Sequence, residues 1–223
     1  MQVVARIHSD FKTKFGIPRQ SGLVQELEAK IVFEEPYRDR TAVRGLEDFS
    51  HIWLIWQFSE AVREDWSPTV RPPRLGGNTR MGVFATRSPF RPNALGLSCV
   101  RLLGIEDTED GKTLRVAGAD MMDGTPIFDI KPYIPYADCK PEAESGFAPD
   151  PGAQLSVEFL PEAEKYIPPE KRDALRGVLA NDPRPRYKQD GERVYALEFA
   201  GLEVKFQVKD NILRVLSAVK AAK

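Results

Sequence analysis

Hydrophobic and polar residues alternate over short stretches of residues 1–135, a pattern that is typical of β-strands. Gly and Pro residues lie between these stretches, where turns are expected. The run from residue 50 to residue 58 is almost entirely apolar, so the strand there is predicted to be buried on both faces. The expected strands are residues 3–7, 29–33, 52–58, 81–86, 96–105 and 114–117.

The connections between these strands favour an antiparallel fold. The stretch from Asp107 to Lys112 contains Asp110-Gly111, which predicts a hairpin turn. Helical signals are few before residue 136. Many short strands without alternating helices indicate an antiparallel barrel or sandwich and not a doubly wound sheet.

The last third of the chain has a different pattern. Residues 136–152 are rich in Pro, Gly, Ala and acidic residues and are predicted to form a linker or long loop. A helix is expected over 170–180, with Leu175, Val178 and Leu179 on one face, and Pro183 prevents its continuation. Strands are expected over 195–199 and 202–208, with Gly201 at the turn. The predicted organisation is a β domain over 1–140, a linker over 141–152 and a small α+β domain over 153–223.

Composition excludes several classes of protein. The 223 residues include no apolar run long enough to span a bilayer, and the first residues do not resemble a signal peptide. Cys99 and Cys139 are too few for a disulfide framework, so a reducing cytoplasm is the expected location. Cys99 falls in a predicted buried strand and is interpreted as an inert thiol. Because His8 and His51 lie far from any Cys or acidic metal-binding pattern, no metal site is expected.

Charge is unevenly distributed although the formal net charge is only −1. Between Trp66 and Ile105 there is no Asp, Glu or Lys, yet the stretch carries six arginines. Arginine without other charged residues suits forked hydrogen bonds to phosphate or carboxylate, although some of these side chains are equally able to pair with acids elsewhere in the fold. The six are Arg71, Arg74, Arg80, Arg87, Arg91 and Arg101.

Four loop-like segments combine Gly, Pro and polar groups: residues 15–22, Ser59-Glu60, residues 71–98 and residues 120–126. In the first, Pro18 fixes the backbone while Arg19 and Gln20 offer directional hydrogen bonds. Taken singly, each segment is equally well explained as a surface turn or a rigid spacer. Their density in one small β domain indicates a binding site. The sequence contains no P-loop, no G-x-G-x-x-G and no G-x-S-x-G.

Three stretches closely resemble one family: RGLEDFSHIWLIWQF, RPPRLGGNTRMGVFATRSPFRPNALGLS and MMDGTPIFDIKPYIPYAD. They resemble the TsaA-like (YaeB/TrmO) family over residues 1–140, and DPRPRY at 182–187 resembles the family's C-terminal domain. The resemblance implies a single-sheet antiparallel β-barrel that binds S-adenosylmethionine, a smaller α+β C-terminal domain and a homodimer. It also implies methylation of the base nitrogen of threonylcarbamoyl-adenosine at tRNA position 37, typically in threonine tRNAs.

The resemblance also implies a set of cofactor contacts. The family often has His-Gln where this chain has Ser59-Glu60, a change that a contact through the backbone would survive. The contacts carried over are Pro18, Arg19, Gln20, Ser59, Glu60, Arg87, Leu97, Asp123, Gly124, Thr125 and Pro126.

Remaining polar residues are assigned to the substrate. tRNA phosphates are expected at Arg71, Arg74, Arg184 and Arg186, and the threonyl carboxylate at Arg80 or Arg91. Asn93 is included with them, and an extruded base is expected to stack on Phe90 or Tyr187.

Asp123 and Glu60 are candidates for a carboxylate beside the positive sulfonium. No residue is assigned as the catalytic base. The alternatives are a non-catalytic S-adenosylmethionine- or RNA-binding module, a methyltransferase with another acceptor, and a structural subunit.

Overall fold

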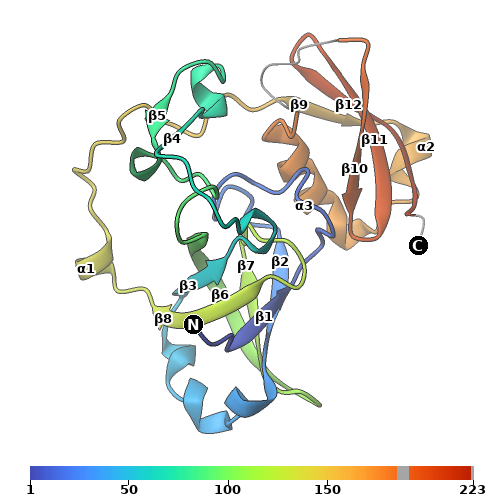
Figure 1. The fold of residues 1–223 in the computed structure, drawn as a ribbon. Coiled ribbons are helices and arrows are strands. Elements are labelled where there is room, and N and C mark those ends of the chain that lie inside the picture. Colours follow the sequence, from blue (N-terminus) through green and yellow to red (C-terminus); the bar gives the residue numbers. More distant parts are fainter. Residues whose placement is uncertain (185–190, 222–223) are drawn as a thin grey trace.

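The computed structural model describes residues 1–184 and 191–221 and has two parts (Figure 1). The first is an antiparallel sheet of six strands in the order β1-β2-β7-β6-β3-β8, and the mainly β prediction is confirmed. β8 pairs with β1, so the sheet closes on itself. The strands are β1 (Ala5–His8), β2 (Glu28–Phe33), β3 (His51–Gln57), β6 (Leu95–Thr108), β7 (Gly111–Ala117) and β8 (Pro126–Pro132).

The core of this sheet comes from alternate residues that point inward. Ile7, Ile31, Leu54, Leu114 and Ile127 are all fully buried there. Each strand of a closed sheet has one inner and one outer face, so its inward residues recur with a period of two. Closure also leaves each of the six strands with a neighbour on both sides.

The prediction that the strand at residues 50–58 is buried on both faces is wrong. In β3, Ile52, Leu54 and Trp56 point into the core, whereas Trp53 and Ile55 lie partly exposed on the outer face. A continuous apolar run indicated two covered faces, but a closed sheet offers each strand only one core. The same geometry applies to Cys99, which pairs with Trp53 across the strands and is only partly buried, contrary to prediction.

The predicted strand over residues 81–86 is also wrong. Only β5 (Met81–Gly82) is extended, paired with β4 (Thr69–Val70), and the chain then enters the 3-10 turn η6 (Val83–Ala85). The backbone N–H of Thr86 donates to the Val83 carbonyl at 3.2 Å, which closes the turn. Further short helices are η1 (Glu35–Tyr37), η2 (Arg40–Val43), η3 (Leu46–Asp48), η4 (Ser59–Ala61), η5 (Pro73–Leu75) and α1 (Pro135–Asp138).

The predicted hairpin at Asp107–Lys112 is confirmed, because β6 and β7 pair as far as Thr108 and Gly111. Gly111 has a φ of 93°, a conformation that favours glycine. The strand β8 was not predicted. Only Pro126, its first residue, was placed in a predicted loop-like segment, and no element was predicted for the rest of the strand.

The C-terminal part is a four-stranded sheet in the order β10-β11-β12-β9, packed against helices. The predicted helix and the predicted hairpin are confirmed, whereas β9 and β12 were not predicted. Leu175, Val178 and Leu179 of the main helix are buried as expected. The elements are β9 (Ser156–Phe159), α2 (Pro161–Glu164), α3 (Pro169–Ala180), β10 (Val194–Phe199), β11 (Leu202–Lys209) and β12 (Ile212–Lys220).

Each part has its own hydrophobic core, but a connection of the first part contributes to the core of the second. The connection between β1 and β2 leaves the closed sheet, and its residues Phe11, Val24 and Leu27 are buried within the C-terminal core. The Phe11 ring packs edge-on against Phe199 at 5.4 Å between centroids. The Lys171 ammonium lies 2.6 Å from the Asp10 carboxylate. The C-terminal domain therefore holds this connection in place.

Close packing at Gly16 fixes the same connection. Gly16 has a φ of 90°, and a Cβ placed there would lie 2.3 Å from Cδ1 of Leu197 in β10. Only glycine meets both conditions without a shift of the neighbouring chain. Among the described residues, no helix is long and apolar enough to cross a membrane.

Candidate functional site

Three connections meet at one end of the closed sheet. Because the strands are antiparallel, β1, β3 and β7 run toward this end and β2, β6 and β8 begin there. The connections are residues 9–27, 58–94 and 118–125. They contain every predicted cofactor residue except Leu97 and Pro126, which lie near the beginning of β6 and at the first residue of β8. The topology therefore brings the loop-like segments that indicated a binding site to one end of the closed sheet.

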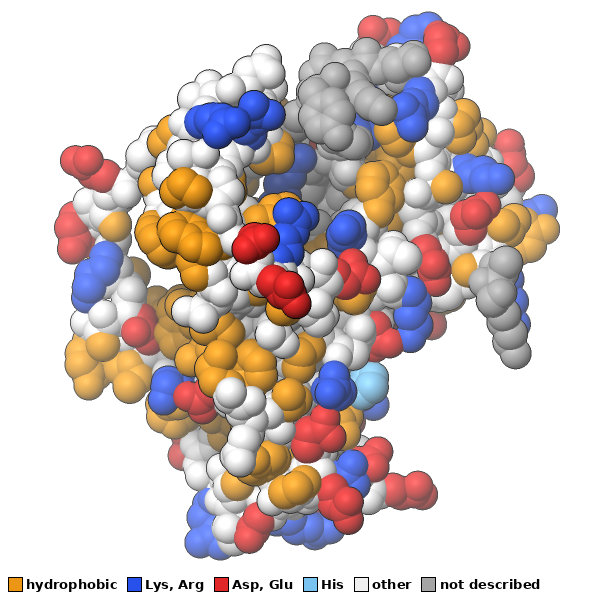
Figure 2. Space-filling model, in the orientation of Figure 1, with side chains coloured by type: hydrophobic (Ala, Val, Ile, Leu, Met, Phe, Trp, Pro, Cys, Tyr) orange, Lys and Arg blue, Asp and Glu red, His pale blue; other side chains and the backbone are white. Residues whose placement is uncertain are grey.

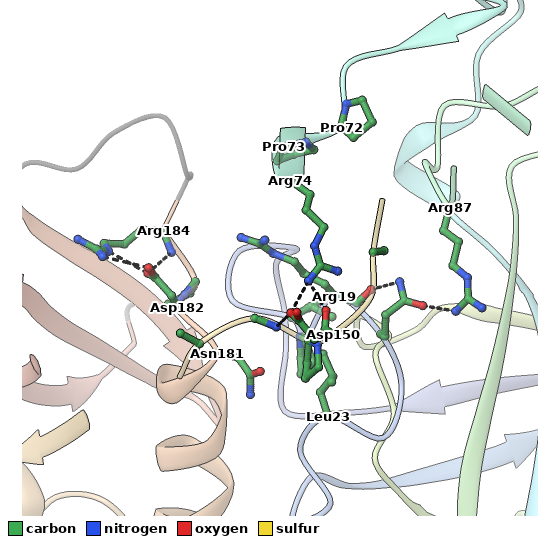
Figure 3. Close-up of a pocket in the computed structure, with 18 of the residues that line it drawn as sticks. Arg19, Leu23, Pro72, Pro73, Arg74, Arg87, Asp150, Asn181, Asp182 and Arg184 are labelled. Atoms are coloured by element: carbon green, nitrogen blue, oxygen red, sulfur yellow. Dashed lines mark hydrogen bonds and ion pairs between the residues drawn. The ribbon is translucent and has the colours of Figure 1, made fainter. Parts of the chain in front are cut away.

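A cleft of about 2040 Å³ lies between this end and the C-terminal domain. Its walls come from the first two connections, from residues 143–153 and from the C-terminal domain (Figure 3). Of the predicted site residues, it is lined by Pro18, Arg19, Gln20, Arg74, Arg87 and Arg184. Residues from three distant parts of the sequence thus share one cavity.

The polar groups of the first two connections are linked across the cleft wall. Arg87 donates through Nη1 to the side-chain oxygen of Gln20. Gln20 in turn donates to the backbone carbonyl of Arg19 at 2.5 Å. Pro18 is buried beneath them, whereas Arg19 and Arg87 are exposed to solvent. Two exposed guanidinium groups, from two different connections, thus lie at one wall of the cleft.

Arg74 holds the segment that joins the two domains. Its Nη2 donates to the Asp150 carboxylate at 3.0 Å and also to the Asp150 carbonyl. The Asp150 carboxylate also accepts from the backbone N–H of Gly152 at 2.8 Å. Arg74 was predicted to contact tRNA phosphate, but in the structure its guanidinium pairs with this acid.

Arg184 is likewise paired. It makes a forked ion pair with Asp182, through Nε at 2.8 Å and Nη2 at 3.0 Å, and its side chain is only 11% exposed. The Asp182 carboxylate raises the pKa of the guanidinium through this hydrogen bond. The Arg184 side chain thus lines the cleft with its charge compensated. Arg186 and Tyr187 lie outside the described residues.

Three predicted contacts, Ser59, Glu60 and Leu97, do not line the cleft. Ser59 and Glu60 form the exposed turn η4, and the Glu60 carboxylate lies 3.9 Å from Nζ of Lys14, a cleft residue. Leu97 is 60% exposed on the outer face of β6, across from Ile55. Its side chain points away from the core of the same chain.

The turn at residues 123–126 is held by β1 and does not line the cleft. The Asp123 carboxylate accepts from the backbone N–H of Ser9 at 3.2 Å, pairs with the Lys12 ammonium and lies 3.3 Å from Nδ1 of His8. Desolvation by itself would raise the pKa of Asp123, but the hydrogen bonds from Lys12 and Ser9 and the charges of Lys12 and His8 together lower it below its ordinary value. Thr125 is buried and donates to the Met122 carbonyl at 2.7 Å, so it stabilises the turn.

The other substrate candidates lie on the connection between β3 and β6. Arg91 donates to the Thr86 carbonyl at 3.0 Å, and Arg80 donates to the Thr69 hydroxyl at 3.3 Å. Arg71 and Asn93 are exposed to solvent. These four residues share one connection, but none of them lines the cleft.

Family models match both parts of the chain. The model for the tRNA-methyltransferase O N-terminal domain matches residues 6–139, and the model for the TrmO C-terminal domain matches residues 152–221. The chain belongs to the tRNA-methyltransferase O family.

Individual relatives extend over nearly the same length. A tRNA (adenine(37)-N6)-methyltransferase of Escherichia coli (strain K12) is 44% identical over 213 residues, which are 92% of this chain and 91% of that protein. One from Eikenella corrodens is 47% identical over 78% of this chain and 98% of its own length. A crystal structure of TrmO from Pseudomonas aeruginosa has a TM-score of 0.81 at 32% identity, covering 98% of this chain and 96% of that one.

One polar residue of this family member was not selected from the sequence. Asp120 precedes two methionines at the end of β7, where an acid is readily explained as a turn cap. In the structure, its carboxylate accepts from the Ser98 hydroxyl at 2.6 Å, and Ser98 accepts from the buried Trp56 indole at 2.9 Å. Burial raises the pKa of Asp120, while hydrogen bonds from Ser98 and the backbone of Ser21 and the charge of Arg87 oppose the rise. Asp120 thus links the core of the closed sheet to Ser21 and Arg87 in the connections at residues 9–27 and 58–94.

Asp120→Ala is expected to lower the free energy of unfolding by about 1–3 kcal/mol, because the Ser98 hydroxyl and the Ser21 amide lose their acceptor. Urea denaturation measures the loss. Asp120→Asn keeps an acceptor without a charge and serves as the control.

The wild type and Asp120→Asn can also be compared as a function of pH. Burial raises the folded-state pKa of Asp120, so ionisation is harder in the folded than in the unfolded protein. The wild type is therefore expected to lose stability relative to Asp120→Asn as pH rises from the unfolded pKa through the folded pKa. A stability difference that stays constant over this window would contradict the assignment.

Proposed function

We propose that this chain is a tRNA (adenine-37)-N6-methyltransferase that uses S-adenosylmethionine as methyl donor. Two of the three connections line a cleft that the C-terminal domain completes, and this arrangement is the observation that carries the proposal. The two relatives named above are tRNA (adenine(37)-N6)-methyltransferases, and a 38% identical protein of Pseudomonas aeruginosa is named a putative S-adenosylmethionine-dependent methyltransferase.

The residues at the cleft fit the charged end of this cofactor. Arg19 and Arg87 offer forked donors for the methionine carboxylate, and Gln20 holds the Arg87 guanidinium in place. When bound, S-adenosylmethionine supplies an electrophilic methyl group on a positive sulfonium. Asp123 has its charge compensated by Lys12, so we assign it to holding the turn at residues 123–126 and not to the sulfonium. The Glu60 carboxylate is more exposed and lies 3.9 Å from the Lys14 ammonium, a looser pair than that of Asp123 with Lys12, so Glu60 is the better candidate for that role.

The finer features of the function follow from the family resemblance. We propose that the acceptor is the base nitrogen of threonylcarbamoyl-adenosine, in threonine tRNAs, and that this nitrogen loses a proton as the methyl group is transferred. We further assign residues 1–140 to a single-sheet β-barrel, 141–152 to a linker and 153–223 to the smaller domain. The closed strand order supports the first assignment. We place the protein in the cytoplasm.

A homodimer would give Leu97 a role. Leu97 is exposed beside the partly exposed Trp53 and Ile55 on the outer face of the sheet. Burying such a patch against a second copy is favourable, since exposed apolar patches typically mark interfaces. We propose that a second copy covers this face.

Methyl transfer is tested directly with S-adenosylmethionine that carries a tritium-labelled methyl group. Purified protein is expected to label total tRNA from a strain that lacks the enzyme, and mass spectrometry of the nucleosides is expected to find the label on the modified adenosine at position 37. A module that only binds the cofactor or RNA leaves no label on RNA. Label on protein or on small metabolites would identify another acceptor.

A further inference from the structure

Exposed aromatic side chains gather on the connection between β3 and β6. Trp66, Phe84 and Phe90 are 52%, 72% and 44% exposed. The rings of Trp66 and Phe84 lie 6.2 Å apart between centroids, so they form one surface. Soluble proteins rarely leave aromatic rings together in solvent without a partner.

The local fold turns Phe84 outward. In η6, Val83 is buried and Phe84 is the next residue, on the opposite side of the turn. The backbone N–H of Val83 donates to the Pro68 carbonyl at 2.9 Å, and the Thr86 hydroxyl donates to the Val83 carbonyl at 2.8 Å. The exposure of Phe84 is therefore built into a hydrogen-bonded turn.

Arginine side chains lie over these rings. The Arg63 guanidinium is 4.3 Å from the centroid of Phe90, and that of Arg91 is 5.9 Å from the centroid of Phe84. Glu64 and Asp65 precede Trp66, but no further acid follows before Glu106. On the face drawn in Figure 2, hydrophobic side chains reach the surface beside Lys and Arg side chains, and the molecule is hollowed between its two parts.

This surface continues into the cleft. Phe84, Thr86 and Arg87 all line the cleft, and Arg87 belongs to the proposed cofactor site. A ligand that stacks on Phe84 would thus lie in the same cleft as the proposed cofactor site.

Aromatic rings alternating with guanidinium groups are typical of sites for unpaired nucleotides. Bases stack on the ring faces, and the cations attract the phosphates between them. We propose that Arg63, Trp66, Phe84, Phe90 and Arg91 form a stacking surface for the unpaired nucleotides that flank the target adenosine in the anticodon loop. This inference rests on the proposed function and names the contacts that bring the RNA to that site.

The test compares the binding of two RNAs to the full-length protein. One RNA is a synthetic anticodon stem-loop, and the other is the same stem as a fully paired duplex. Trp66→Ala and Phe84→Ala are each expected to weaken binding of the stem-loop about tenfold, because loss of one stacked base has an effect of that order. Binding of the duplex is expected to stay the same. Fluorescence anisotropy of labelled RNA measures both.

The matched control is Tyr136→Ala. Tyr136 is 88% exposed but lies on α1, away from the residues that line the cleft. It is expected to bind both RNAs like the wild type. Stacking should also quench the fluorescence of Trp66, so the stem-loop is expected to quench the wild type more strongly than Trp66→Phe.

Methylation kinetics distinguish failure of the stacking surface from failure of the proposed methyltransferase function. If the wild type does not methylate tRNA, the proposed function fails. If it does, Trp66→Ala is expected to raise KM for tRNA while the Kd for S-adenosylmethionine is unchanged. Stem-loop affinity equal to the wild type in both variants would overturn the stacking surface. Loss of self-association with unchanged RNA affinity would overturn it too, and would assign these rings to an interface between two copies.

Discussion

Phe199→Ala is expected to lower the free energy of unfolding by about 3–5 kcal/mol and to weaken S-adenosylmethionine binding at the same time. Phe199 is fully buried in the C-terminal core, and its ring packs edge-on against Phe11. Phe11 lies at the start of the connection that carries Pro18, Arg19 and Gln20. Loss of this contact removes an anchor of the cofactor loop without altering any residue that lines the cleft.

Urea denaturation measures the loss of stability, and calorimetry at a temperature where the variant is folded measures cofactor affinity. Phe199→Leu keeps most of the side-chain volume, and it replaces the alanine variant in both measurements if that variant does not fold. Val219→Ala, at a half-exposed position of the same sheet, is the control and should change neither quantity. If a destabilised variant at Phe199 keeps full affinity, the C-terminal domain does not hold the cofactor loop.

Arg87→Ala is expected to weaken S-adenosylmethionine binding about 10- to 100-fold, the effect of losing about 1.5–3 kcal/mol from a hydrogen bond between charged groups. Arg87 is exposed, so its truncation should leave thermal unfolding nearly unchanged. Gln20 also loses its donor from Arg87, which adds to the loss.

Isothermal titration with S-adenosylmethionine measures this affinity. Arg87→Lys keeps the charge but not the planar fork and should bind with intermediate affinity. Arg101→Ala removes an exposed arginine from the outer part of β6 and is the charge-matched control. Equal affinity of wild type and Arg87→Ala would remove Arg87 from the site.

Local pattern was enough wherever neighbouring residues decide the structure. The hairpin between β6 and β7, the helix α3 and the hairpin between β10 and β11 were all predicted, because each depends on residues a few positions apart. The glycine- and arginine-bearing loops were also found from the sequence, since the residue types that bind anions are visible without coordinates.

The same approach failed where a distant partner decides. The apolar run of β3 predicted two buried faces, yet closure of the sheet provides one core. Arg74 was predicted to be available for phosphate, but it pairs with Asp150. Asp123 was one of two candidates for a carboxylate beside the sulfonium, but it pairs with Lys12, which lies 111 residues earlier in the sequence. Both ion-pair partners lie far away in the sequence, and closure of the sheet likewise depends on strands that are distant along the chain.

By itself, then, the sequence determined the mainly β character, most of the local elements, the family resemblance and the loops that are proposed to bind the cofactor. Only the tertiary structure decided which of those loops meet at one end of the closed sheet and which charges remain available there. It also showed that residues 11–27 are anchored in the core of the other domain. The physical reason is that propensity and periodicity act between near neighbours, whereas ion pairing and burial depend on segments that only the folded chain brings together.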